Sequence, residues 1–180
     1  MWNIANFLNS PSTGNDPYGA LYSGIQRANI VLRYIDQIPA SGITEEDRSM
    51  IKGEALFLRG YQYFLLVNNY KEVPLRLIPS NEDETNKAAA TEAALWAQVE
   101  EDLDNAIKCN LPVERSTAKE RITKGAAIAM LGKVYATQHK YPEAKQLLGT
   151  LLKAPYSYEL MDNFEKNFTN EEEFNKESVF

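Results

Sequence analysis

One stretch decides the fold: residues 51–74 read IKGEALFLRGYQYFLLVNNYKEVP and form the most apolar run in the chain. Over residues 55–67, only Arg59, Gly60 and Gln62 are not hydrophobic. A helix that is apolar on nearly every side packs inside a protein. The run is too short for the roughly 20 residues that a bilayer crossing needs, and Arg59 lies in its middle. The stretch therefore predicts a central helix that is packed on several sides.

Particular residues of this helix predict contacts with its neighbours. Gly53 and Gly60 lie on one stripe, and an interior glycine costs about 1 kcal/mol relative to alanine, so we expect another helix to approach closely there. Arg59 needs a carboxylate or carbonyl partner, because a buried unpaired guanidinium is prohibitively costly. The side chains that we expect to be buried, in this helix and in later ones, are Phe57, Leu58, Phe64, Leu65, Leu131 and Leu148.

Four other segments repeat apolar residues at spacings of three and four, which is typical of amphipathic helices. The five predicted helices lie near residues 18–38, 44–69, 91–110, 122–139 and 142–154. Thr44 is placed to cap the central helix, because acidic residues follow it in the first turn. The stretch VPLRLIP, from Val73, is expected to be extended, since a residue before proline avoids the helical region.

The last two predicted helices form a helix–turn–helix unit of about 34 residues, which is the period of the tetratricopeptide repeat. Small residues at Gly125, Ala129, Gly132 and Ala136 would let a partner backbone come near. The first helix and the central helix make a looser pair of the same kind. Such pairs bury their apolar faces only by stacking on neighbours. The predicted fold class is all-α, with tetratricopeptide-like antiparallel helix pairs that form a right-handed helical scaffold.

Composition narrows the function. The net charge of −6 and the pI of about 5.0 argue against a nucleic-acid partner. A single cysteine, Cys109, and a single histidine, His139, provide no disulfide framework and no zinc or histidine metal site; we interpret them as a small helix residue and a surface or capping residue. The sequence contains no catalytic motif, so we predict a protein that is not an enzyme and needs no cofactor. A calcium site in the acidic loop 81–84 is a minor alternative, because its spacing does not fit an EF-hand.

The central stretch resembles the signature helix of the SusD/RagB family, whose pattern reads roughly A-E-A-x-F-L-R-A-x-x-Y-F-x-L-V and then Y-G-D-V-P. Three further blocks resemble that family in the right order: YSGIQRAN from Tyr22, WAQVEEDLDNA from Trp96, and the exit segment that ends in ESVF. The sequence departs from the pattern where Gly53 and Gly60 replace alanines, Lys71 a glycine and Glu72 an aspartate. These departures concern packing and one turn.

The resemblance implies a function and a location. Members are outer-membrane, surface-exposed lipoproteins that capture oligosaccharides or polysaccharides and deliver them to a SusC-like TonB-dependent transporter. It also implies that residues 1–180 are a single partial domain from the N-terminal half, in which a lead-in (1–17) precedes the helix pairs (18–154) and an irregular exit segment (155–180). The lipid anchor would then lie on a segment absent from this chain. The alternative is a tetratricopeptide-like protein-interaction scaffold without sugar binding.

Two sets of residues are singled out. In the family, the segment before the first long helix often contacts ligand, and Trp2, Asn3 and Tyr18 have the right chemistry for sugar binding. The competing interpretation is that Trp2 packs against the helices or lies at a cut end. Asn29 and Arg59 are expected to have structural roles, because polar groups inside apolar helices need partners. Trp96, at a core spacing of its helix, is interpreted as packing and not as a sugar platform.

Overall fold

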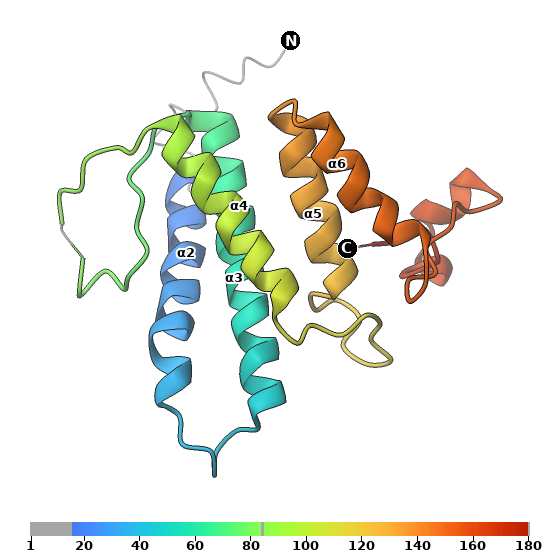
Figure 1. Cartoon of the computed structure of the whole chain (residues 1–180), viewed down its shortest axis with the longest axis horizontal. Helices are drawn as coiled ribbons and strands as arrows, with labels where there is room; N and C mark the ends of the chain where they lie inside the picture. The colour runs from blue at the N-terminus through green and yellow to red at the C-terminus, as the bar shows by residue number, and fades with distance from the viewer. Residues whose placement is uncertain (1–15, 84, 180) are drawn as a thin grey trace.

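The computed structural model describes residues 16–83 and 85–179, and the regular secondary structure in these residues is helical, without any β-strand (Figure 1). The α-helices are α2 (Pro17–Tyr34), α3 (Glu45–Tyr70), α4 (Glu92–Lys108), α5 (Lys124–Thr137) and α6 (Tyr141–Leu148). Short 3₁₀ helices follow as η1 (Ile35–Gln37), η2 (Gly149–Leu152), η3 (Phe164–Phe168) and η4 (Asn170–Glu172). The all-α prediction is confirmed.

The helices pack in chain order, each against the next, and alternate in direction (Figure 1). The pair α2–α3 and the pair α5–α6 are the two predicted antiparallel pairs, with α4 between them. The central helix α3 is therefore covered by α2 on one side and by α4 on the other. None of the helices in the described part of the chain has the length and apolar character that a membrane crossing requires.

Three of the helices begin with a threonine N-cap, whose side-chain oxygen accepts a hydrogen bond from a backbone N–H of the first turn. Thr44, Thr91 and Thr123 play this part for α3, α4 and α5, and each satisfies a donor that the helix leaves unpaired. The cap predicted at Thr44 is thus present. Two α-helices end earlier than predicted: α2 stops before residue 38 and α6 stops before residue 154. In both places a short 3₁₀ helix, η1 or η2, replaces the last predicted α-helical turn.

The core confirms three of the six predicted buried positions, shows one to be partly buried and corrects two. Phe57, Phe64 and Leu131 are buried, whereas Leu65 is only partly buried at the edge of the core. The prediction was wrong for Leu58, which is 42% exposed, and for Leu148, which is 37% exposed. Leu58 follows Phe57 by one position, so it points about 100° away from the core face of α3.

Leu148 keeps one side in contact with protein. A Cβ placed at Gly132 would lie only 2.4 Å from Leu148 Cδ2, so the leucine covers this glycine while its other side faces solvent. The close approach predicted for α3 is also present. A Cβ at Gly60 would lie 3.1 Å from Leu103 Cγ on α4, and one at Gly53 would lie 2.8 Å from Cys109 Cβ. These contacts give both α3 glycines a packing reason.

The turn after α3 explains the glycine of the family pattern at this position. Lys71 ends the helix at φ 64° and ψ −93°, a region that L residues rarely adopt and that stores about 1–3 kcal/mol of strain. Its side chain forms an ion pair with Glu92, with a distance of 3.2 Å from Nζ to Oε1. Both partners are well exposed, so this pair contributes little.

We therefore expect Lys71→Gly to stabilise the protein by about 1 kcal/mol, which raises Tm by roughly 2–4 °C for a chain of this size. Differential scanning calorimetry checks this. Lys71→Ala is the matched control, because it removes the same ion pair but keeps the strained backbone, and it should give no gain. An equal rise in both variants would show that strain is not the cause.

Candidate functional site

Of the three predicted ligand residues, the structure describes one, Tyr18. Trp2 and Asn3 fall outside the described residues. Tyr18, in the first turn of α2, is partly buried, with its ring centroid 4.9 Å from that of Tyr22 and 5.1 Å from that of Tyr70. Tyr22 donates a hydrogen bond to the Pro74 carbonyl at 2.6 Å, and burial raises its pKa well above the ordinary value. Tyr18 thus belongs to an aromatic cluster at the start of the helical body.

A buried polar network lies behind this cluster, and it supplies the partner that Arg59 requires. The Arg59 guanidinium donates to both carboxylate oxygens of Asp102, at 2.6 and 2.8 Å. It also donates to Asn29 Oδ1 at 2.9 Å. All three side chains are buried. Gln98 donates to Asp102 from one turn earlier on α4, at 3.0 Å. The predicted acceptor for Arg59 is therefore confirmed as a carboxylate.

The same network holds the extended segment that follows α3, which the sequence predicted from its prolines. Asn29 Nδ2 donates to the carbonyls of Arg76 and Ile78, at 3.0 and 3.1 Å. The Tyr63 hydroxyl donates to the Arg76 carbonyl at 2.9 Å and accepts from the Arg76 N–H at 2.7 Å. Burial raises the pKa of the Tyr63 hydroxyl above its ordinary value. The segment is thereby fixed against α2 and α3.

The acidic loop that follows is held by cations. The Asp83 carboxylate accepts ion pairs from Arg76 at 3.3 Å and Lys87 at 3.0 Å, and Glu82 pairs with Arg33 at 2.9 Å. The described residues contain no cluster of three or more histidine, cysteine or acidic side chains that could hold a metal. Glu84, one of the residues considered for a calcium site in this loop, lies outside the described residues.

The two residues set aside on chemical grounds lie at helix ends. Cys109 is the first residue after α4, and partial burial raises the pKa of its thiol, which lowers its reactivity. His139 is exposed just beyond α5 at φ 62°, with its Nδ1 2.7 Å from the Tyr141 hydroxyl.

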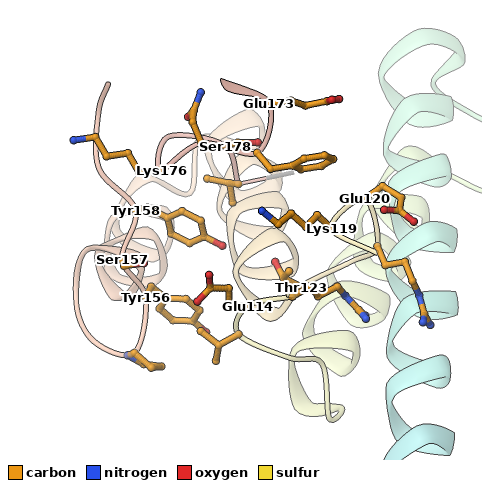
Figure 2. A pocket seen from close by; sticks show the side chains of 17 residues that line it. Glu114, Lys119, Glu120, Thr123, Tyr156, Ser157, Tyr158, Glu173, Lys176 and Ser178 are labelled. Carbon is orange, nitrogen blue, oxygen red and sulfur yellow. The ribbon is translucent and has the colours of Figure 1, made fainter. Parts of the chain in front are cut away.

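A cavity of about 600 Å³ lies in the C-terminal part of the chain (Figure 2). Two segments that are far apart in sequence enclose it. One is the loop between α4 and α5 up to the N-cap residue of α5, over residues 113–123, and the other is the exit segment, over residues 155–179. Sequence analysis did not predict this cavity.

Ion pairs fix the first wall of the cavity. Glu54 on α3 accepts from Arg115 at 2.5 Å and from Arg121 at 2.7 Å. Arg115 also donates to the Ile122 carbonyl through Nε at 3.2 Å and through Nη2 at 2.9 Å. The loop is therefore tied both to the central helix and to itself.

Hydrogen bonds within the exit segment fix the second wall. The Glu177 carboxylate accepts from the Met161 N–H at 2.8 Å and from Asn167 Nδ2 at 3.0 Å, and these bonds lower its pKa. The Glu159 N–H donates to the Lys176 carbonyl at 3.0 Å, which joins the two ends of the segment.

Two tyrosines carry the aromatic surface of the cavity. Tyr156 and Tyr158 are two residues apart in an irregular stretch, and both side chains line the cavity. Their ring planes are 13° apart and their centroids are 6.1 Å apart. A Cβ at Gly125 would lie 2.2 Å from the Tyr158 hydroxyl, so this glycine of α5 makes room for the ring. Burial raises the pKa of Tyr156, and the neighbouring Tyr158 adds to the effect.

The antiparallel helix pairs and the pinned segment between α3 and α4 define a tetratricopeptide-like all-α scaffold. The profile of a SusD-like family, described as "Starch-binding associating with outer membrane", matches residues 2–136. The chain therefore belongs to the SusD-like family, and the resemblance inferred from its sequence is confirmed. No curated protein sequence matches it.

Solved structures agree with this assignment. A laminarin-binding SusD-like protein is 33% identical with a TM-score of 0.86, and the match covers 98% of this chain and 39% of that one. A SusD superfamily protein from Bacteroides vulgatus is 32% identical with a TM-score of 0.83, over 98% of this chain and 38% of the other. Surface glycan-binding protein A from Bacteroides uniformis, at 24% identity and a TM-score of 0.82 over 93% of this chain and 38% of the other, shares the fold. This chain thus spans less than half the length of these proteins.

Proposed function

We propose that the chain is the N-terminal helical part of a cell-surface glycan-binding lipoprotein. The observation that carries the proposal is the match of the SusD-like family profile over residues 2–136. The laminarin-binding relative, which aligns over nearly the whole chain, supports a carbohydrate ligand. In this proposal the protein binds and does not catalyse, lies on the outer membrane through a lipid anchor outside this chain, and delivers oligosaccharides to a SusC-like TonB-dependent transporter.

The proposed contacts are Trp2, Asn3 and Tyr18. Supporting this, Tyr18 lies at the beginning of α2, and the polar network of Asn29, Arg59 and Asp102 fixes the helices behind it. A rigid scaffold under aromatic side chains reduces the entropy lost on binding. Asn29 and Arg59 act in this proposal only through structure, because their polar atoms are used in buried bonds.

The test is a titration of the full-length protein with starch and laminarin oligosaccharides by isothermal titration calorimetry. We expect Trp2→Ala to weaken binding about tenfold or more, because stacking on an aromatic ring is a main source of sugar affinity. Tyr141→Ala is the control, since Tyr141 is an aromatic residue that is 60% exposed on α6. Unchanged affinity in a folded Trp2→Ala protein would remove Trp2 from the site.

The second candidate function is a protein-interaction scaffold without sugar binding, which the tetratricopeptide-like pairs favour. The two functions differ in a simple observable. The scaffold predicts that the full-length protein binds no glycan on an array of neutral and acidic glycans. A TonB-dependent transporter gene directly beside this one would favour glycan capture.

A further inference from the structure

We propose that the cavity between the α4–α5 loop and the exit segment is a second carbohydrate subsite, which takes a neutral oligosaccharide. The inference rests on the proposed glycan-binding function. Of the described residues, Tyr18 does not line this cavity, so the inference adds a site that does not include Tyr18. The argument depends on the size of the cavity, its aromatic surface, its free polar groups and its charge.

The size and the aromatic surface suit a sugar. The volume of about 600 Å³ falls within the range of small-molecule sites, roughly 300–1,000 Å³. The nearly parallel rings of Tyr156 and Tyr158 form one apolar surface along the cavity, and both rings are partly buried. Phe174 from the far end of the exit segment adds a third ring to the lining. Apolar sugar faces pack against rings of this kind.

Polar side chains around these rings are available to sugar hydroxyls. Glu114 and Lys119 come from the α4–α5 loop and Ser157 lies between the tyrosines, and all three side chains line the cavity (Figure 2). Within residues 16–83 and 85–179, these three side chains have no hydrogen-bond or ion-pair partner. A carboxylate, an ammonium and a hydroxyl supply acceptors and donors at once, which is the combination that sugar hydroxyls need.

The charge of the lining favours a neutral ligand. Three carboxylates and four cations line the cavity. Two of the cations, Arg115 and Arg121, are paired with Glu54 behind the wall, and Lys176 pairs with Glu159. The three carboxylates of the lining are those of Glu114, Glu120 and Glu173. A sulfated or uronic-acid glycan would meet these carboxylates without an excess of free cations, so the lining disfavours an anionic ligand.

The two walls are held independently, which keeps the subsite preformed. Glu54 fixes the loop wall, and Glu177 fixes the exit segment through Met161 and Asn167. Gly125 sets the position of Tyr158, because a side chain at this place would meet the Tyr158 hydroxyl. The subsite can thus be perturbed in two ways, by removing a lining group or by displacing one.

The experiment begins with the full-length wild-type protein on an array of neutral and acidic glycans. The best neutral glycan is then titrated against Tyr156→Ala and against Glu114→Ala with Lys119→Ala. Glu114 and Lys119 are exposed, so their removal leaves the fold intact. We expect each variant to weaken binding about five- to tenfold, from the loss of one stacked ring or of the polar contacts. Gly125→Ala should weaken binding as well, although it removes no lining side chain.

Phe164→Ala is the matched control, because Phe164 is an aromatic residue of the same segment, is 72% exposed and does not line the cavity. Its affinity should equal that of wild type. If Trp2→Ala weakens binding while the cavity variants bind as tightly as wild type, the subsite is overturned and the proposed function still holds. A preference for acidic glycans overturns the neutral ligand. Absence of any glycan binding by wild type overturns both proposals.

Discussion

Replacing Asp102 with alanine is expected to lower the free energy of unfolding by about 3–5 kcal/mol, the usual cost of removing one partner from a buried ion pair. The Asp102 side chain is 1% exposed and accepts two hydrogen bonds from Arg59 and one from Gln98. Without it, the guanidinium stays buried with only Asn29 and a long contact of 3.4 Å to the Leu77 carbonyl. Equilibrium unfolding in urea, followed by circular dichroism, measures the loss.

Two controls separate the buried charge from other causes. Asp104→Ala removes a carboxylate from the same helix, but Asp104 is half exposed and pairs with Lys108 on the surface, so the effect should stay below about 1 kcal/mol. The double variant Arg59→Met with Asp102→Leu removes both charges and should be clearly more stable than Asp102→Ala alone, because no uncompensated charge remains. A double variant as unstable as Asp102→Ala would contradict the explanation.

The need of Arg59 for a partner could be predicted from the sequence, but the identity of the partner could not. An arginine among apolar residues indicates by itself that a hydrogen-bond acceptor must lie nearby. Whether that acceptor is a carboxylate or a carbonyl depends on which helix packs beside the arginine. One signal was present. Asp102 follows Val99 by three residues and precedes Ala106 by four, so it lies on the apolar face of its helix, where an unpaired charge is costly. Together, a buried arginine on α3 and a buried aspartate on α4 indicate that Arg59 and Asp102 form an ion pair.

The helices could be predicted for a similar local reason. Periodicity, threonine caps and prolines act within a few residues, so the existence and order of the helices follow from the sequence. Burial at single positions could not be predicted equally well. Leu58 and Leu148 have the composition of core residues, but their exposure depends on which sides of α3 and α6 receive a neighbour. That arrangement is a property of the whole fold.

The cavity of Figure 2 shows the same limit for function. Its walls come from segments more than thirty residues apart, residues 113–123 and 155–179. Tyr156 and Tyr158 look ordinary in an irregular stretch, and only the packing of the exit segment against Gly125 places their rings in a recess. The spacing of two residues was the one available signal that both rings could lie on the same side.

Phe57→Ala is the other change with a large expected effect, again about 3–5 kcal/mol, because truncating a fully buried phenylalanine removes apolar contacts and leaves a cavity. Phe57 has no exposed surface and lies in the core of α3, where its ring stacks on that of Tyr61 with planes 7° apart and centroids 6.3 Å apart. Out of a total stability of roughly 5–15 kcal/mol for a domain, this loss is large enough to move the urea midpoint clearly.

Leu58→Ala supplies the matched control, because Leu58 is the next residue of the same helix and is 42% exposed. Both substitutions put the best helix former at neighbouring positions, so differences in helix propensity contribute little to the comparison. We expect Leu58→Ala to cost about 1 kcal/mol or less, because a half-exposed leucine gains only part of the burial energy. Urea unfolding of the two variants side by side decides the orientation of α3. A Leu58→Ala loss equal to that of Phe57→Ala would show that the helix turns a different face to the core.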